Sequence, residues 1–358
     1  MRDFKTSIKD IALEELDREL VARGARVQDH VKFKFETAES TPGRDDMVCQ
    51  LTELFLKAPS PDEALNSFST GQIVEELLDR QRKDKGDRGI WLRDSRRDFF
   101  NIKEKKVVEN VESVPAICFS DTLTPYDSRH LMLKVRNFGE IFNLCQCEPF
   151  REQPIAAGRL CTGFLIDDDI VATAGHCANK KNVSQLRIIF GYKLQNPSQQ
   201  VNKIPIENVY QGKKIVARQY DRDVKGKDWA LIRLDRKVDN RPVLRLSGDP
   251  ALSPRPVYVL GYPCGLPLKY ASGAWVKCVY DRSFGADLDV YSGNSGSPVF
   301  DAETHEVLGM IVHGNSKDFR WTGKCWMSIV FPNPEFYSEE AQCIWLKASH
   351  GRGSQLEM

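Results

Sequence analysis

Ser295 stands in a glycine-rich run, because segment 293–298 has the sequence GNSGSP. A serine hydroxyl is a weak nucleophile at neutral pH. It needs a general base within hydrogen-bond reach and donors for the oxyanion that it creates. Gly293 lacks a Cβ and can turn its N–H inward. The N–H groups of Gly293 and Ser295 are therefore the candidate oxyanion hole.

Two upstream segments contain the partners that such a nucleophile requires. Segment 171–177 reads VATAGHC and contains His176, and segment 227–232 reads KDWALI and contains Asp228. We predict that His176 is the general base toward Ser295 and then the general acid toward the leaving amine. Asp228 is predicted to hold one imidazole tautomer and to stabilise the imidazolium.

Each of these residues has a plainer interpretation when it is taken alone. Ser295 could be a turn residue, His176 a satisfied core histidine, and Asp228 the first residue of a strand. The three segments together, in this order, favour catalysis. Two alternatives stay open: a catalytically silent binding module in a regulatory or defence complex, and an esterase that acts on non-peptide substrates.

The segments TAGHC, DWALI and GNSGSPV resemble the three signature regions of chymotrypsin-fold serine peptidases, in the same chain order. The GNSGSPV form is similar to the bacterial branch that includes the staphylococcal glutamyl endopeptidases. The resemblance covers residues 112 to 350 and implies an all-β fold of two six-stranded antiparallel barrels. It also implies a serine endopeptidase, a hydrolase that works through an acyl-enzyme, with the triad between the barrels.

Asn294 departs from the trypsin-like pattern. Trypsin-like zymogens have an aspartate at this position, which pairs with the ammonium of a newly cut N-terminus. A neutral amide cannot make that ion pair, so activation by this route is not expected. Control of activity is expected to come from elsewhere, with the N-terminal third as the candidate. If that third inhibits in cis, a chain that starts near Val107 should be more active than the full chain.

The sequence indicates less clearly which residues determine substrate specificity. Asp289 lies six residues before Ser295, where trypsin-like enzymes place the carboxylate that binds Arg or Lys. Val312, His313 and Gly314 resemble the strand that lines the specificity pocket, and glutamyl endopeptidases use a histidine there to bind an acidic side chain. Cleavage after basic residues is favoured. Asp289 as a turn cap and His313 as a wall residue remain open.

The composition of the whole chain excludes several classes of function. The chain has 358 residues with 51 Lys and Arg against 50 Asp and Glu, so no net field would draw it to nucleic acid or an anionic membrane. No transmembrane run and no leader of signal-peptide type is evident, which favours a cytoplasmic location. No phosphate loop or paired acidic metal site is evident either, so we expect protein or peptide substrates and no cofactor.

The ten cysteines leave the redox state open. Cys161 and Cys177 resemble the pair that bridges the histidine loop in animal trypsins. They would be linked in an oxidising compartment and reduced in cytosol. Cys145 and Cys147 form a C-x-C that is too tight for the usual zinc ligand spacing.

The elements divide the chain into two parts. Residues 1–105 are predicted to form a charged helical module that regulates the enzyme or recognises a partner. The apolar periodicity of residues 11–21 and the capping-box sequence SPDE at residues 60–63 support this prediction. Short β-branched segments separated by turn residues follow, which predicts a peptidase domain over 106–350 and a tail over 351–358. A final helix is expected over 338–347.

Overall fold

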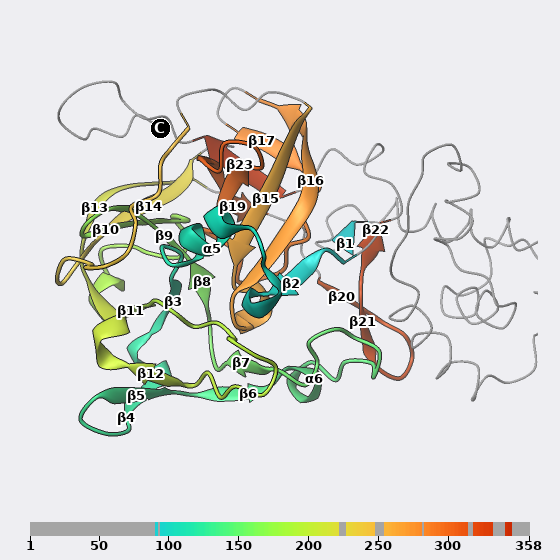
Figure 1. Cartoon of the computed structure of the whole chain (residues 1–358), viewed down its shortest axis with the longest axis horizontal. Helices are drawn as coiled ribbons and strands as arrows, with labels where there is room; N and C mark the ends of the chain where they lie inside the picture. Colours follow the sequence, from blue (N-terminus) through green and yellow to red (C-terminus); the bar gives the residue numbers. More distant parts are fainter. Residues whose placement is uncertain are drawn as a thin grey trace, which may run out of the picture.

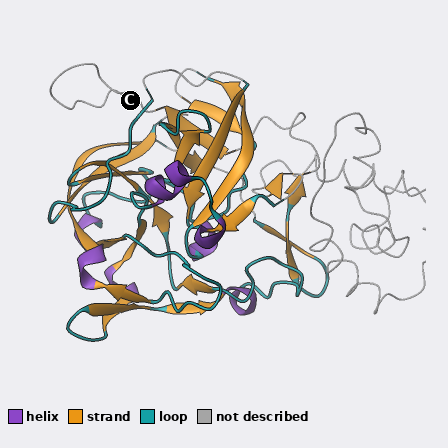
Figure 2. Ribbon diagram, in the orientation of Figure 1, coloured by secondary structure: helices purple, strands orange, loops and turns teal. Residues whose placement is uncertain are grey.

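The computed structural model describes residues 90–91, 94–221, 227–247, 254–280, 283–313, 318–331 and 341–345. Most of the predicted helical module over 1–105 and the whole tail over 351–358 lie outside these residues. In the described part of that module the prediction of helix is wrong for residues 90–91 and 96–98, which form strands because they pair with later strands of the chain. Strands dominate the described part, and the helices are few and short (Figures 1 and 2). The prediction of a mostly β fold is confirmed. No helix among the described residues is long and apolar enough to cross a membrane.

The first large sheet has seven strands and contains His176 and Asp228 at or beside its strands. Its spatial order is β8 (Cys161–Thr162), β3 (Ala116–Phe119), β11 (Leu186–Ile189), β13 (Val209–Tyr220), β14 (Asp228–Leu234), β10 (Ile170–Thr173) and β9 (Phe164–Asp167). The two edge strands, β8 and β9, are separated along the chain only by Gly163. The sheet therefore curls back until its two edges meet at one residue.

The second large sheet carries the strand that follows Ser295. Its order is β15 (Arg255–Gly261), β18 (Pro298–Asp301), β19 (Val307–His313), β23 (Ala341–Trp345), β17 (Ser283–Ala286), β16 (Lys269–Val279) and β2 (Arg96–Asp98). Because β15 also pairs with β16, six of these strands close on one another. β2 pairs with the first residues of β16, beyond the stretch that pairs with β17.

Smaller elements surround the two sheets. The strands are β12 (Lys203–Pro205), β5 (His130–Leu133) and β4 (Leu123–Pro125) in one sheet, and the pairs β1 (Ile90–Trp91) with β22 (Val330–Phe331), β20 (Phe319–Trp321) with β21 (Trp326–Ser328), and β6 (Val135–Asn137) with β7 (Pro154–Ala156). The helices are α5 (Lys105–Val111), α6 (Phe138–Ile141) and the 3-10 turns η3 (Phe99–Asn101), η4 (Ser120–Thr122), η5 (Val183–Gln185), η6 (Ile206–Asn208) and η7 (Pro263–Gly265).

Local sequence explains several of these elements. β14 and β19 are buried along most of their length and carry the continuous apolar runs typical of strands covered on both faces. α5 buries Val107, Asn110 and Val111, which the helical period places on one face. Asn137 caps α6, because its side chain accepts a hydrogen bond from the N–H of Glu140.

The predicted helix over 338–347 is wrong where the structure describes it. Residues 341–345 form β23, which pairs with Phe284 and its neighbours in β17 and with Met310 and its neighbours in β19. A short apolar run does not reveal by its periodicity whether it is a helix or a strand. The open position between β17 and β19 is a tertiary property that selects the strand.

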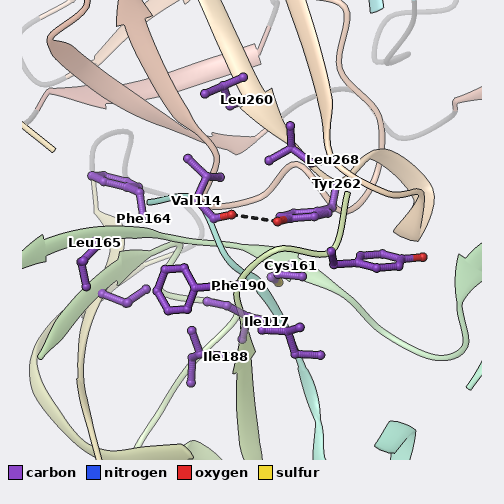
Figure 3. Close-up of a cluster of buried hydrophobic side chains, with 14 of the residues drawn as sticks. Val114, Ile117, Cys161, Phe164, Leu165, Ile188, Phe190, Leu260, Tyr262 and Leu268 are labelled. Atoms are coloured by element: carbon purple, nitrogen blue, oxygen red, sulfur yellow. Dashed lines mark hydrogen bonds between the residues drawn. The ribbon is translucent and has the colours of Figure 1, made fainter. Parts of the chain in front are cut away.

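One large apolar cluster joins the two sheets. It contains Phe164 and Phe190 from the part of the chain that forms the first sheet. From the second sheet it contains Leu260 and Tyr262, at the end of β15. Figure 3 shows these side chains within one cluster, with the Tyr262 hydroxyl donating to the carbonyl of Val114 at 2.8 Å. A site that takes residues from both sheets is therefore held on one packed core. Phe99 and Phe100 pack against the same cluster, which anchors the segment before α5 to it.

Candidate active site

His176 and Asp228 form a two-point contact. His176 follows β10, and β10 pairs directly with β14, of which Asp228 is the first residue. The backbone N–H of His176 donates to Asp228 Oδ1 at 2.8 Å, and His176 Nδ1 lies 2.7 Å from Asp228 Oδ2. The Asp228 carboxylate is buried, whereas the His176 ring is partly exposed. The aspartate is thus shielded while the imidazole reaches solvent.

This contact selects the form of the imidazole that a general base needs. A carboxylate can only accept, so Nδ1 of His176 carries the proton that it shares with Asp228. In the neutral ring the other nitrogen, Nε2, is then left with a lone pair that can accept a proton. The pair has the arrangement expected of a base and the residue that orients it.

Ser295 lies in a tight loop with two glycines in the left-handed region. Gly293 has φ of 97° and Gly296 has φ of 87°. A Cβ on Gly293 would lie 2.4 Å from the carbonyl oxygen of Tyr262, and one on Gly296 would lie 2.1 Å from that of Thr162. Only glycine fits either position, so Gly293 and Gly296 are required by packing as well as by backbone conformation.

Thr162, which the sequence analysis did not single out, connects this loop to the first sheet. Its N–H donates to the carbonyl of Ser295 at 2.9 Å, and its hydroxyl donates to the carbonyl of Gly293 at 2.8 Å. The same hydroxyl accepts from the N–H of Tyr262 at 3.2 Å. Thr162 is fully buried. It therefore fixes two carbonyl groups of the loop, that of Gly293 and that of the candidate nucleophile itself.

A disulfide joins the histidine segment to the same place. Cys161 precedes Thr162, Cys177 follows His176, and the two sulfurs are bonded, which is one of the two states that the sequence left open. Cys177 Sγ also lies 3.9 Å from the carbonyl oxygen of Ser295. The structure therefore brings His176, Asp228 and the Ser295 loop into one region, with Thr162 and the disulfide between the sheets.

Among the described residues, one group of three side chains has the spacing of metal ligands, and it consists of the two disulfide cysteines and His176. The ligand atoms of Cys161, His176 and Cys177 lie within 4.8 Å of one another. Both sulfurs are committed to the disulfide, so neither is a thiolate that could bind a metal. The structure gives this group no metal-binding role.

Asn294 is buried and bonded within the loop. Its Oδ1 accepts from the Ser297 hydroxyl at 3.2 Å, and its N–H donates to the carbonyl of Tyr291 at 3.1 Å. The neutral amide is therefore part of the turn that leads to Ser295, in keeping with its inability to hold a cation.

The predicted substrate-reading residues occupy different environments. Asp289 is 5% exposed, and its Oδ2 accepts from the N–H and the hydroxyl of Ser95 at 2.8 and 2.6 Å. Val312 is buried. His313 is beside the catalytic pair, with Nε2 at 3.8 Å from Asp228 Oδ2. Gly314 lies outside the described residues.

A second disulfide was missed by the sequence analysis. Cys145 bonds to Cys325 across 180 residues of sequence and links the loop after α6 to the β20–β21 hairpin. Cys145 drew attention only as part of a C-x-C pattern, and no local signal points to a partner so distant.

Residues 161–310 match the family model described as "Trypsin-like peptidase domain". No curated protein matches the chain. Similar solved structures include a Glu endopeptidase in complex with MPD, with 18% identity, a TM-score of 0.41, and coverage of 63% of this chain and 87% of that chain.

Two further similar structures are proteases from named bacteria. The active form of Rv3671c from M. tuberculosis has 18% identity and a TM-score of 0.37, with 67% of this chain and 79% of that chain covered. The Vibrio cholerae VesB protease has 17% identity and a TM-score of 0.40, with 65% and 63% covered. These scores are too low to indicate specificity.

Proposed function

We propose that His176, Asp228 and Ser295 form the catalytic triad of this chain, which is a chymotrypsin-fold serine endopeptidase. The observation that carries the proposal is the two-point contact of His176 with Asp228, at 2.8 and 2.7 Å. Two bonds fix both the position of the histidine backbone and the rotation of its ring.

The reaction follows from the roles of these residues. Ser295 Oγ attacks the carbonyl carbon of the scissile peptide while its proton passes to Nε2 of His176. The N–H groups of Gly293 and Ser295 stabilise the oxyanion of the tetrahedral intermediate. The C–N bond then breaks as His176 gives the proton to the amine. Water attacks the acyl-enzyme by the same route in reverse and restores the serine.

We propose that the two sheets are the two six-stranded barrels that the resemblance implies. In the second sheet, the β15–β16 pairing closes a ring of six strands. In the first, β8 and β9 act as one bent strand around Gly163, which leaves six strands around the ring. His176 and Asp228 then belong to the first barrel and Ser295 leads into the second.

We propose limited cleavage of a specific protein target, under control of the N-terminal module. Cleavage after basic residues is the specificity that Asp289 predicts, and Val312, His313 and Gly314 are the candidate pocket wall. The burial of Asp289 and its bonds to Ser95 support an anchoring role as well. Profiling cleavage sites with a peptide library, for the protein and for Asp289→Ser, tests this specificity. An unchanged preference in the variant would count against substrate binding by Asp289.

A fluorophosphonate probe tests the reaction itself. The probe should label the folded protein on Ser295, identified by sequencing the labelled peptide, and should not label a heat-denatured sample. Ser295→Ala should lose both the label and peptide cleavage. Label at another residue, or cleavage that survives in Ser295→Ala, would remove the triad. A labelled protein that cleaves no peptide in a broad library would favour the alternative, a binding module on this scaffold.

A further inference from the structure

Segment 94–98, which precedes the region of the family resemblance, is built into the second sheet. β2 pairs antiparallel with the start of β16, in the register Asp98 to Lys269 (Figure 1). Lys269 Nζ lies 2.6 Å from Asp98 Oδ1, and both side chains are almost fully buried. The segment is therefore fixed in place by a strand pairing and by a buried ion pair.

Just before this strand, Ser95 reaches the beginning of the loop that ends at Ser295. Its N–H and its hydroxyl both donate to Oδ2 of Asp289. Two donors on one oxygen, one of them from the backbone, hold the carboxylate in a single orientation. The first residue of loop 289–295 is thus bound to a residue 194 positions upstream.

Arg96 supports the same loop two residues further on. Its guanidinium lies over the Tyr291 ring, with Cζ at 4.2 Å from the ring centroid. Nε and Nη2 each donate to a different oxygen of Asp94 at 2.8 Å, which fixes the guanidinium plane. The Arg96 side chain is 2% exposed. A planar cation held by a bidentate carboxylate and stacked on an aromatic ring is a rigid support.

Tyr291 passes this support on to the oxyanion donors. The N–H of Asn294 donates to the carbonyl of Tyr291 at 3.1 Å, so the turn over residues 291–294 is closed by Tyr291 itself. Asn294 lies between Gly293 and Ser295, whose N–H groups are the proposed donors. A displacement of Tyr291 would therefore move the peptide groups that must point at the oxyanion.

We propose that Ser95 and Arg96 are positioning residues that hold loop 289–295 in its catalytic form in the uncut chain. The inference rests on the proposed function. It makes segment 94–98 part of the active site. Arg96 is then an internal cation that supports a loop whose Asn294 cannot form an ion pair with an ammonium. A chain that starts at Val107 lacks both contacts, so it is expected to be less active than the full chain.

The test compares two arginines of the same strand in the full chain. Arg96→Met removes the guanidinium from Tyr291. Arg97→Met is the matched control, because the Arg97 guanidinium contacts Ser272 and Tyr270 instead of the loop. We expect Arg96→Met to lower kcat about tenfold or more with KM changed less than about twofold, since misplaced oxyanion donors weaken binding of the transition state. Arg97→Met should keep the kcat of the unchanged protein, and Arg96→Lys should recover part of it.

Ser95→Ala keeps the assay informative if Arg96→Met does not fold, because it removes one hydroxyl and leaves the backbone bond to Asp289. It should lower kcat severalfold at temperatures well below its unfolding midpoint. Equal kcat in folded Arg96→Met and Arg97→Met, or unchanged kcat in Ser95→Ala, would overturn the inference. Labelling of the unchanged protein by the fluorophosphonate separates the two proposals. Without label on Ser295 the proposed function fails, whereas equal labelling rates in the protein and its variants refute the positioning role alone.

Discussion

His313 Nε2 lies 3.8 Å from Oδ2 of Asp228, the same oxygen that His176 Nδ1 approaches to 2.7 Å. The two imidazole rings are nearly parallel, with a 14° angle between their planes and 6.3 Å between their centroids. One buried carboxylate thus faces two imidazoles. His313 was predicted as a wall of the specificity pocket, and its position also lets it influence the catalytic pair.

The His313 contact predicts how substitution affects different substrates. His313→Ala removes a group beside the base, so kcat/KM should fall by a similar factor for matched peptides with Glu, Lys or Ala before the scissile bond. We expect a loss of up to about fivefold, because a contact between a carboxylate and an exposed, protonated imidazole contributes up to about 1 kcal/mol. A loss confined to the Glu peptide would instead assign His313 to recognition of an acidic side chain.

The Asp228 carboxylate predicts a large effect on rate with little effect on folding. In Asp228→Asn, the oxygen that accepts from the His176 backbone can be kept while an NH2 group faces Nδ1. The imidazole is then held in the wrong tautomer, and kcat should fall by about four orders of magnitude. Asp169→Asn, which removes a carboxylate paired with Arg233 on the first sheet, is the control and should keep full activity. Comparable activity in the two variants would contradict the role of Asp228.

The buried contacts of Thr162 predict that kcat depends on its hydroxyl group. Thr162→Val keeps the shape of the side chain but leaves the Gly293 carbonyl and the Tyr262 N–H without this partner. A buried unpaired group costs about 1–3 kcal/mol, and because the Gly293 peptide adjoins the oxyanion donor we expect kcat to fall about tenfold.

The controls for Thr162 separate this effect from a general loss of stability. Thr162→Ser should retain most of the rate, since it keeps the hydroxyl. Thr122→Val removes another buried hydroxyl, which donates to the Phe119 carbonyl, and should lower the melting temperature without lowering kcat. If Thr162→Val retains the kcat of the unchanged protein, Thr162 has no role in positioning the loop.

Lys269 predicts a rise of stability with pH. Burial lowers the pKa of Lys269 to about 8, although the neighbouring Asp98 acts in the opposite direction. Below pH 8 the folded and unfolded chains both hold the proton. Between pH 8 and the ordinary lysine pKa of about 10.4, the folded chain has lost it while the unfolded chain still binds it. The contribution of Lys269 to the free energy of unfolding should therefore rise with pH, by up to about 1.4 kcal/mol per pH unit.

Denaturant unfolding of the protein and of Lys269→Met at pH 7 and pH 9.5 checks this sign. The stability of the protein relative to the variant should be larger at the higher pH, because only the protein carries the titrating amine. A difference that is constant, or that shrinks as the pH rises, would show that the Lys269 amine is not destabilised by burial.

The fold could be predicted from the sequence as far as its class. The strands around His176, Asp228 and Ser295 carry β-branched, apolar runs whose burial the structure confirms at β10, β14 and β19. Strand β23 could not be predicted, because residues 341–345 are a strand only by virtue of the gap between β17 and β19 that they fill. Local propensity is silent about such a gap.

The sequence by itself determined which residues could do chemistry, since a nucleophile, a base and an orienting acid each stand in a local motif. The tertiary structure alone decided what holds them. The bonds of Ser95 to Asp289, of Thr162 to Gly293 and of Cys145 to Cys325 join residues 194, 131 and 180 positions apart. Such pairings leave no periodic trace in either partner, because each depends on how distant segments pack, and only the folded chain brings the partners within bonding distance.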